Sequence, residues 1–200
     1  MHSRHLKTFA ALFFGATSLA AVAHTGQDGG LHDLVFTDGL LHPLTGTDHL
    51  AAMLAVGVWS ALSATFLRHL VAAPLAFAGM LLAGAVAGQA GFTLPAVEPM
   101  IAASLLVLGL LLASRATLPA ALGASLAGVF AVFHGLAHGT KLAGSTQAFP
   151  PLAGMMAATL ALHLAGIGIG LALRARSAWW PRAAGGLVAL LGGAFLLQLI

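Results

Sequence analysis

The 200-residue sequence contains no cysteine, and only 6% of its residues are charged. Without cysteine, disulfide bonds, thiolate metal ligands and thiol nucleophiles are all excluded. The scarcity of charge argues against a water-soluble fold, because soluble domains carry about 25% charged residues. Hydrophobic residues instead make up 60% of the chain, and the mean hydropathy is +0.99. This composition indicates an integral membrane protein.

The N-terminus has the features of a targeting segment. Arg4 and Lys7 give a positive start, an apolar stretch follows, and the sequence AVA at 21–23 is a small-x-small cleavage site. The apolar stretch is short for a membrane span, which needs about 20 residues. We therefore expect a signal peptide over 1–23, with His24 becoming the mature N-terminus outside the cytoplasm. An uncleaved first helix is the alternative.

Six apolar stretches follow, each bounded by proline, glycine or charged residues. Their lengths suit transmembrane helices, which need about 20 residues each. We therefore predict an all-α integral membrane protein with a six-helix transmembrane bundle over 48–200. A periplasmic or interfacial segment rich in His and Asp, with one short helix, is expected before it, over 24–47. The predicted spans are Asp48–Leu67, Ala72–Ala90, Val97–Ser114, Pro119–Ala137, Pro151–Leu173 and Arg182–Ile200.

The charged residues are distributed unequally between the predicted loops. With the mature N-terminus outside, the cytoplasmic loops hold five arginines, whereas the outer loops hold only Lys141. This asymmetry agrees with the positive-inside rule and predicts a multi-pass protein of the bacterial inner membrane. All five acidic residues and six of the ten histidines fall on the outer side. The outer half is therefore rich in oxygen and nitrogen ligands.

Small residues recur at four-residue spacing in several of these stretches. Such patterns allow helix backbones to approach closely in lipid, so they predict a compact bundle. The pairs are Gly84 with Gly88, Gly166 with Gly170, and Gly79 with Ala83.

The first motif with candidate ligand residues is HPLTGTDH, from His42 to His49. A regular helix would separate these two histidines by about 10 Å along its axis, too far for one metal ion. Pro43 and Gly46 predict an irregular start, however. A turn there would fold His42 back towards Asp48 and His49. Otherwise the two histidines are successive binding positions along one ion path.

Asp48 is the more informative residue of this motif. A carboxylate inside a membrane span costs about 2.5–3.5 kcal/mol, so it should have a partner. The structural alternative is that Thr45 or Asp48 serves as a helix N-cap and the histidines are only interfacial.

The second motif is FHGLAHG, which contains His134 and His138. Their i, i+4 spacing places both imidazoles on one helix face within a single turn. That spacing suits two ligands to one ion. The pair lies at the outer end of the fourth predicted span, at the depth expected for the first motif. Two clusters of matching chemistry at matching depth predict a shared metal site.

Further candidates are less specific. Glu98 begins the third predicted span and is either a ligand or a first-turn acid favoured by the helix dipole. His163 lies mid-span and is either a hydrogen-bonded core residue or a deeper relay for an ion or proton. His24 and His32 in the outer segment are candidates for metal capture. His69 is expected in a cytoplasmic loop.

Imidazole and carboxylate without thiolate suit Ni, Co, Zn or Fe(II) and argue against Cu(I). No G-x-x-x-x-G-K-[ST] or H-E-x-x-H motif is present, which argues against nucleotide-driven transport and against a metalloenzyme. The few basic residues are expected to set topology rather than bind nucleic acid. One alternative is a b-type haem or electron-transfer protein with axial His49 and His134. Another is a metal-binding accessory subunit that does not transport.

The segments HPLTGTDHLAAMLAVGVWSA (His42–Ala61) and VFHGLAHG (Val132–Gly139) resemble the HupE/UreJ family. The resemblance covers the whole mature chain. It implies a permease rather than an enzyme, carrying Ni²⁺ or Co²⁺ as the transported ion and not as a permanent cofactor. It also implies a link to urease or hydrogenase maturation proteins. An acidic residue is expected near Lys141, so this cation departs from the family pattern. The family's metal positions correspond to His42, Asp48, His49, His134 and His138.

Overall fold

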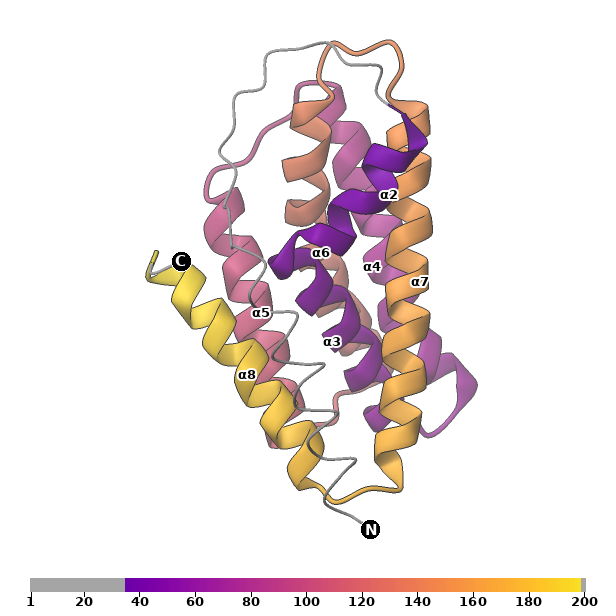
Figure 1. Ribbon diagram of the computed structural model, residues 1–200, viewed down its shortest axis with the longest axis vertical. Helices are drawn as coiled ribbons and strands as arrows, with labels where there is room; N and C mark the ends of the chain where they lie inside the picture. The colour runs from indigo at the N-terminus through magenta and orange to yellow at the C-terminus, as the bar shows by residue number, and fades with distance from the viewer. Residues whose placement is uncertain (1–34, 199–200) are drawn as a thin grey trace. The chain divides into compact units, whose positions relative to one another are not determined.

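The computed structural model describes residues 35–198, and this part of the chain is helical throughout, with no β-strand. The expected signal peptide, its cleavage site and the candidates His24 and His32 lie outside the described residues. The short helix expected before the first span is present as α2 (Figure 1). The helices are α2 (Phe36–Thr45), α3 (Thr47–Ser63), α4 (Leu67–Gln89), α5 (Val97–Ser114), α6 (Ala120–Lys141), α7 (Phe149–Arg174) and α8 (Trp179–Leu196).

Helices α3 to α8 occupy the six apolar stretches, with differences at their ends. Helix α5 has the predicted bounds, Val97–Ser114. Helix α4 begins at Leu67 rather than Ala72, so His69 lies in its first turn and the expectation of a loop there was wrong. Helix α6 continues to Lys141, which therefore lies in the last helical turn and not in a loop. Long Lys and Arg side chains can extend from helix ends to the interface, so such residues need not end a helix.

Four of these helices, α4, α5, α6 and α7, are long and apolar enough to cross a membrane. Large apolar side chains also cover the outside of the bundle: Phe149 is 80% exposed and Leu190 is 74% exposed. A surface of this kind is unfavourable in water and is expected where lipid is the solvent. Helices α3 and α8 do not meet the same length and composition standard, so the six-span bundle stays a prediction.

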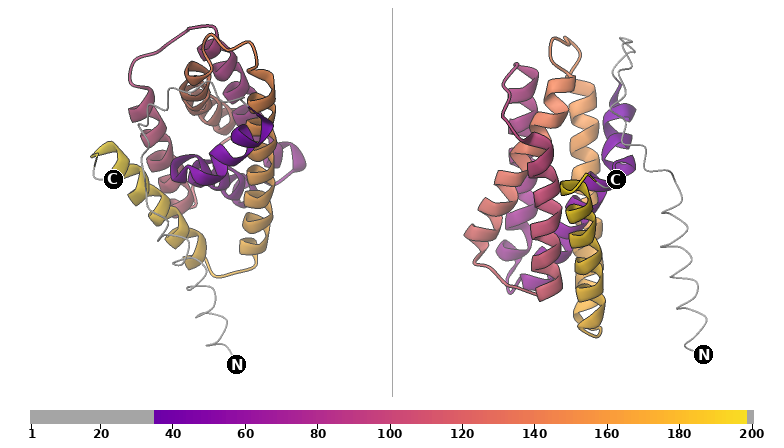
Figure 2. Two further views of the ribbon diagram at one scale, coloured as in Figure 1. Left: turned by 45° about the horizontal axis from the view of Figure 1, so that its top comes forward. Right: turned by 90° about the vertical axis from the view of Figure 1, so that its left-hand side faces the viewer.

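The helices pack most extensively in three pairs: α4 with α6, α5 with α8, and α3 with α7. Helix α2 also lies against α7. In Figures 1 and 2, α2 and α3 (indigo) form a bent segment that packs against α7, and α3 also contacts α5 and α8. The core between the pairs contains fully buried Met53 and Val56 from α3, Phe77 and Leu81 from α4, and Leu105 from α5.

Glycines allow the α4–α6 pair to approach at the level of the backbone. A Cβ atom added at Gly135 would lie 2.1 Å from the carbonyl oxygen of Leu81, and one at Gly84 would lie 2.4 Å from that of Val132. No side chain fits at these distances, so the two backbones are in direct contact. Helix α6, with His134, is thereby held in a fixed position against α4.

Glycines also allow close backbone approach in the α3–α7 pair. A Cβ atom at Gly166 would lie 2.5 Å from the carbonyl oxygen of Leu54, and one at Gly170 would lie 2.6 Å from Cβ of Ala61. The packing role predicted for the 84/88 and 166/170 pairs is therefore confirmed. The prediction for Gly79 was wrong, because nothing lies within 4 Å of a Cβ atom built there.

Candidate metal centre

The segment from His42 to His49 forms two helices with a break between them. Helix α2 runs through Pro43 and ends at Thr45, Gly46 has an extended backbone (φ −76°, ψ 114°), and α3 begins at Thr47. We expected the irregularity to start at Pro43, and it is confined to Gly46 instead. Because Pro43 is buried against the neighbouring helices, packing holds α2 together across the proline.

The break at Gly46 turns the side chain of His42 back towards α3. The ring centroids of His42 and His49 are 5.8 Å apart, well below the separation of about 10 Å that a regular helix would impose. Of the two arrangements left open by the sequence, the structure has the convergent one. Discontinuous helices of this kind form ion sites in many membrane transporters, because the break frees backbone groups and redirects side chains.

Four imidazole rings from three helices meet at this break. His42 of α2 and His49 of α3 both approach His138 of α6, with centroid distances of 4.7 and 4.5 Å. His49 also lies 4.9 Å from His134, which precedes His138 by one turn. The two sequence motifs therefore form one group. We call the five residues that they contribute the outer cluster: His42, Asp48, His49, His134 and His138.

Asp48 supplies the negative charge of the outer cluster. Its Oδ1 lies 2.9 Å from Nδ1 of His49, and 27% of its side chain is exposed. The capping alternative was wrong, because the N-cap of α3 is Gly46 and the Thr45 hydroxyl donates to the Leu41 carbonyl. Asp48 stands in the first turn of α3, where the helix dipole favours a carboxylate.

The Asp48 contact also fixes the tautomer of His49. With Nδ1–H donating to the carboxylate, Nε2 of His49 carries the lone pair, and this atom is buried without a hydrogen-bond partner. A carboxylate bonded to the far nitrogen of an imidazole is the usual support of a metal-binding histidine. The pair is therefore prepared to present Nε2 to a cation.

His134 is oriented by Ser104 of α5, a residue that our sequence reasoning missed. The Ser104 hydroxyl donates to the Ile101 carbonyl at 2.6 Å, so its oxygen accepts from Nε2–H of His134 at 3.0 Å. This leaves Nδ1 of His134 as the acceptor atom, and Nδ1 is buried without a partner. The only signal in the sequence was a single serine within an apolar helix.

Burial increases inward across the outer cluster. His42 is exposed, Asp48 is partly exposed, and His49, His134 and His138 are buried. Each of the three buried imidazoles has one nitrogen without a hydrogen-bond partner in the described part of the chain. An unpaired buried polar group costs about 1–3 kcal/mol, so three in one place call for an explanation such as a ligand.

The outer cluster supplies donors without forming a finished coordination sphere. Within residues 35–198, no group of three or more His, Asp or Glu side chains is arranged to hold a metal ion. The rings meet edge to face, with interplanar angles of 89° for both His42–His138 and His49–His134. Their nitrogens therefore do not converge on one point in this arrangement.

The remaining candidates lie elsewhere. Glu98 is exposed in the first turn of α5 and forms no ion pair with a described residue. Lys141 is exposed in the last turn of α6, three residues after His138. His163 of α7 is 2% exposed, and neither of its ring nitrogens has a hydrogen-bond partner within residues 35–198.

The fold and the site define a helical membrane protein with a histidine–carboxylate cluster that opens towards one end of its helices. The model of the HupE / UreJ protein family matches residues 11–195, and this chain belongs to that family. Protein HupE of Rhizobium leguminosarum bv. viciae is 40% identical over 184 residues, which cover 91% of this chain and 94% of that protein. No solved structure matches.

Family membership settles the class of the protein. HupE/UreJ proteins are membrane accessory proteins of hydrogenase and urease systems, associated with nickel or cobalt transport, and they are not enzymes. The chain is accordingly a multi-pass membrane protein.

Proposed function

We propose that the protein is a permease that takes up Ni²⁺, or Co²⁺, across the inner membrane for the maturation of a metalloenzyme. The observation that carries this proposal is the outer cluster itself. Four imidazoles and one carboxylate from three helices are gathered in an apolar bundle, and three buried ring nitrogens have no partner. The metal ion is the substrate of the protein and not a resident cofactor.

The first step in this proposal is capture at the exposed edge of the outer cluster. His42 is the exposed imidazole, and the segment with His24 and His32 precedes it in the chain. Asp48 offsets the charge of the entering cation at the membrane boundary. The position of Asp48 in the first turn of α3 and its partial exposure support this role.

The second step is replacement of bound water by buried nitrogens. Nε2 of His49, Nδ1 of His134 and Nε2 of His138 are available as ligands. The rings must turn from their edge-to-face contacts to reach one ion. This rearrangement costs free energy and so lowers the net affinity for the ion. Moderate affinity suits transport, because an ion held too tightly would not leave.

The donor set and the family together favour nickel or cobalt. Nitrogen and carboxylate ligands without sulfur suit Ni²⁺, Co²⁺ and Zn²⁺ and disfavour Cu(I). The family's association with hydrogenase and urease, both served by accessory proteins, then favours nickel as the cargo. Maturation proteins for those enzymes are the partners we expect on the cytoplasmic side.

The proposed orientation places the outer cluster on the periplasmic side. In this topology α3 to α8 form six spans, and the helix ends at Arg68, Arg115 and Arg174 face the cytoplasm. The positive-inside rule supports that orientation. The signal peptide over 1–23 would then deliver the mature N-terminus to the periplasm.

A haem protein is disfavoured by the geometry of its two candidate axial ligands. The rings of His49 and His134 are in edge-to-face contact at a centroid distance of 4.9 Å, which leaves no room for a porphyrin between them. A metal-binding accessory subunit without transport has the same cluster, and only an uptake measurement separates it from a permease.

The test is ⁶³Ni²⁺ accumulation in cells that produce the wild-type protein, Asp48→Asn or His138→Leu at equal membrane levels. We expect accumulation with the wild type and its loss in both variants. Asp38→Asn is the matched control, because Asp38 is an exposed acid of α2 whose carboxylate, among the described residues, bonds only the Val35 backbone. Accumulation by wild-type cells no greater than by cells without the protein would refute the permease and leave a binding subunit.

A further inference from the structure

Six buried side-chain atoms in the described chain lack a hydrogen-bond partner, and they belong to five residues. Three are the ring nitrogens of His49, His134 and His138, which the outer cluster explains. The other three are both ring nitrogens of His163 and Oγ of Ser60. Buried polar atoms are normally paired, so His163 and Ser60 require an explanation of their own.

One aromatic side chain contacts both His163 and the outer cluster. Phe77 of α4 is fully buried, and its ring centroid lies 5.6 Å from that of His134 and 5.2 Å from that of His163. The phenyl ring therefore neighbours both the fully buried imidazole of the outer cluster, His134, and His163. The ring is apolar and offers no ligand in place of the water around a hydrated ion.

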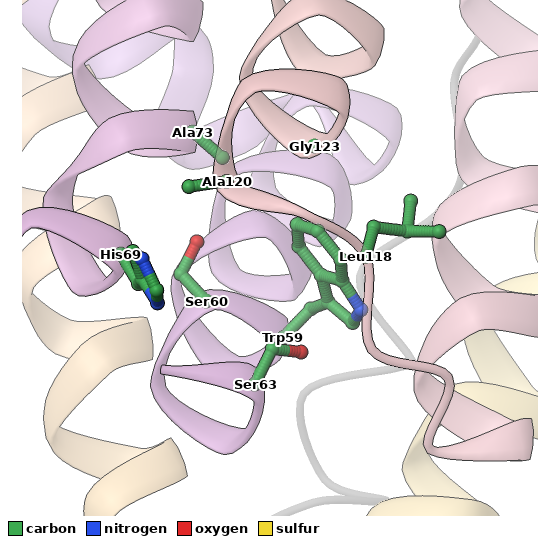
Figure 3. Close-up of a pocket in the computed structure, with 8 residues that line it drawn as sticks. All are labelled: Trp59, Ser60, Ser63, His69, Ala73, Leu118, Ala120 and Gly123. Carbon is green, nitrogen blue, oxygen red and sulfur yellow. The ribbon is translucent and has the colours of Figure 1, made fainter. Parts of the chain in front are cut away.

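Beyond this contact the polar side chains continue towards the opposite end of α4. Ala73, one turn before Phe77, lines a small pocket together with Ser60, Ser63 and His69 (Figure 3). The pocket holds about 20 Å³, which is enough space for a single water molecule. His69 is tied to this end through Nδ1, which lies 3.0 Å from the Thr65 hydroxyl.

His163 is held rigidly at the crossing of α3 and α7. A Cβ atom added at Gly57 would lie 2.4 Å from the carbonyl oxygen of His163, so the α3 backbone abuts the α7 backbone at this residue. Ser60 follows Gly57 by about one turn on α3. A histidine fixed in this way presents its imidazole at a defined depth.

We propose that His163 is an inner station for the transported divalent cation and that Phe77 closes the path between it and the outer cluster. This inference rests on the proposed function and specifies the path. The cation leaves the outer cluster when the Phe77 ring moves aside, and one neutral nitrogen of His163 takes over as a ligand. It then passes Ser60 and regains water in the pocket beside Ser63 and His69.

The inner station is tested by His163→Leu in proteoliposomes loaded with a fluorescent metal chelator. Leucine fills much of the same space and removes two unpaired buried atoms, so the fold should be kept or stabilised. We expect the Ni²⁺ uptake rate to fall by about tenfold or more, as for lost metal-supporting groups elsewhere. Ni²⁺ binding by the purified protein should be unchanged, because the outer cluster is intact.

Thr159→Val is the matched control, because Thr159 is a buried residue of α7 one turn before His163 whose hydroxyl is already satisfied by the Met155 carbonyl. If His163→Leu does not fold, His163→Gln replaces it. Wild-type uptake by either His163 variant would overturn the inner station while the permease stands. Failure of the wild-type protein itself to transport would refute the proposed function and the inner station with it.

The closing role of Phe77 has a separate readout. Phe77→Ala should let protons leak through the liposome membrane, measured with an entrapped pH dye, because the apolar barrier is removed. Leu108→Ala makes a comparable cavity in α5 at a residue that is also buried, and it should not leak. Equal proton permeability in these two variants would overturn the assignment of Phe77.

Discussion

Asp48 is the residue whose removal has the most calculable effect. The change Asp48→Asn keeps the shape of the side chain and deletes its charge. A carboxylate and a divalent cation about 4 Å apart attract each other by about 2 kcal/mol in water and about 8 kcal/mol at an effective dielectric of about 20. Because 27% of the Asp48 side chain is exposed, solvent screens this attraction. We therefore expect the loss of binding free energy to be near the lower value.

A loss of about 2–3 kcal/mol corresponds to a Kd raised by about 30- to 150-fold. The substitution also weakens the hydrogen bond from His49 Nδ1, because a neutral amide replaces the charged acceptor at 2.9 Å. The measurement is equilibrium binding of ⁶³Ni²⁺ to purified protein at fixed pH and ionic strength, with Asp38→Asn as the control. An Asp48→Asn protein that binds Ni²⁺ with wild-type affinity would refute the assignment of Asp48 to the site.

Three further predictions concern single residues. Ser104→Ala should weaken Ni²⁺ binding by about tenfold, because the residue that fixes the tautomer of His134 is lost; the same equilibrium-binding measurement checks it. Gly135→Ala should lower the midpoint of thermal unfolding, because the added Cβ would lie 2.1 Å from the Leu81 carbonyl oxygen and overpacking costs about 1–3 kcal/mol. Lys141→Glu should tighten Ni²⁺ binding by less than about tenfold, because an exposed charge is screened.

Each of these predictions has an internal control. Ser114→Ala removes a serine of α5 whose hydroxyl, among the residues that the structure describes, bonds only carbonyls of its own helix, and it should leave Ni²⁺ binding unchanged. Gly186→Ala adds a Cβ into open space and should not lower the unfolding midpoint. The increase in Ni²⁺ affinity from Lys141→Glu should disappear at high salt. An increase that persists at high salt would contradict an electrostatic origin.

The helices were predictable because each is an apolar stretch ended by proline, glycine or charge. Helix α5, with no ambiguity at either end, has the bounds read from the sequence. The ends of α4 and α6 were misplaced because Arg68 and Lys141 were taken as loop residues, although both stand in helical turns. Charge marks the membrane boundary, and a helix can continue past that boundary.

The candidate site was predictable in its residue types and only partly in its geometry. The two motifs contain the donors. The irregular segment that brings them together was expected to run from Pro43 to Gly46, and the structure confines it to Gly46. Ser104 and Phe77 were missed for a different reason. Each is a single residue in an apolar helix, and only tertiary packing brings it against His134.

The central claim is that the outer cluster carries a divalent cation through the membrane. The most direct test is Ni²⁺ entry into proteoliposomes that contain only this protein, compared with the double variant His49→Leu/His138→Leu. We expect chelator-filled liposomes with the wild-type protein to fill with Ni²⁺ and those with the double variant to match protein-free liposomes. Equal entry in the two preparations, or no entry with the wild type, would contradict the claim.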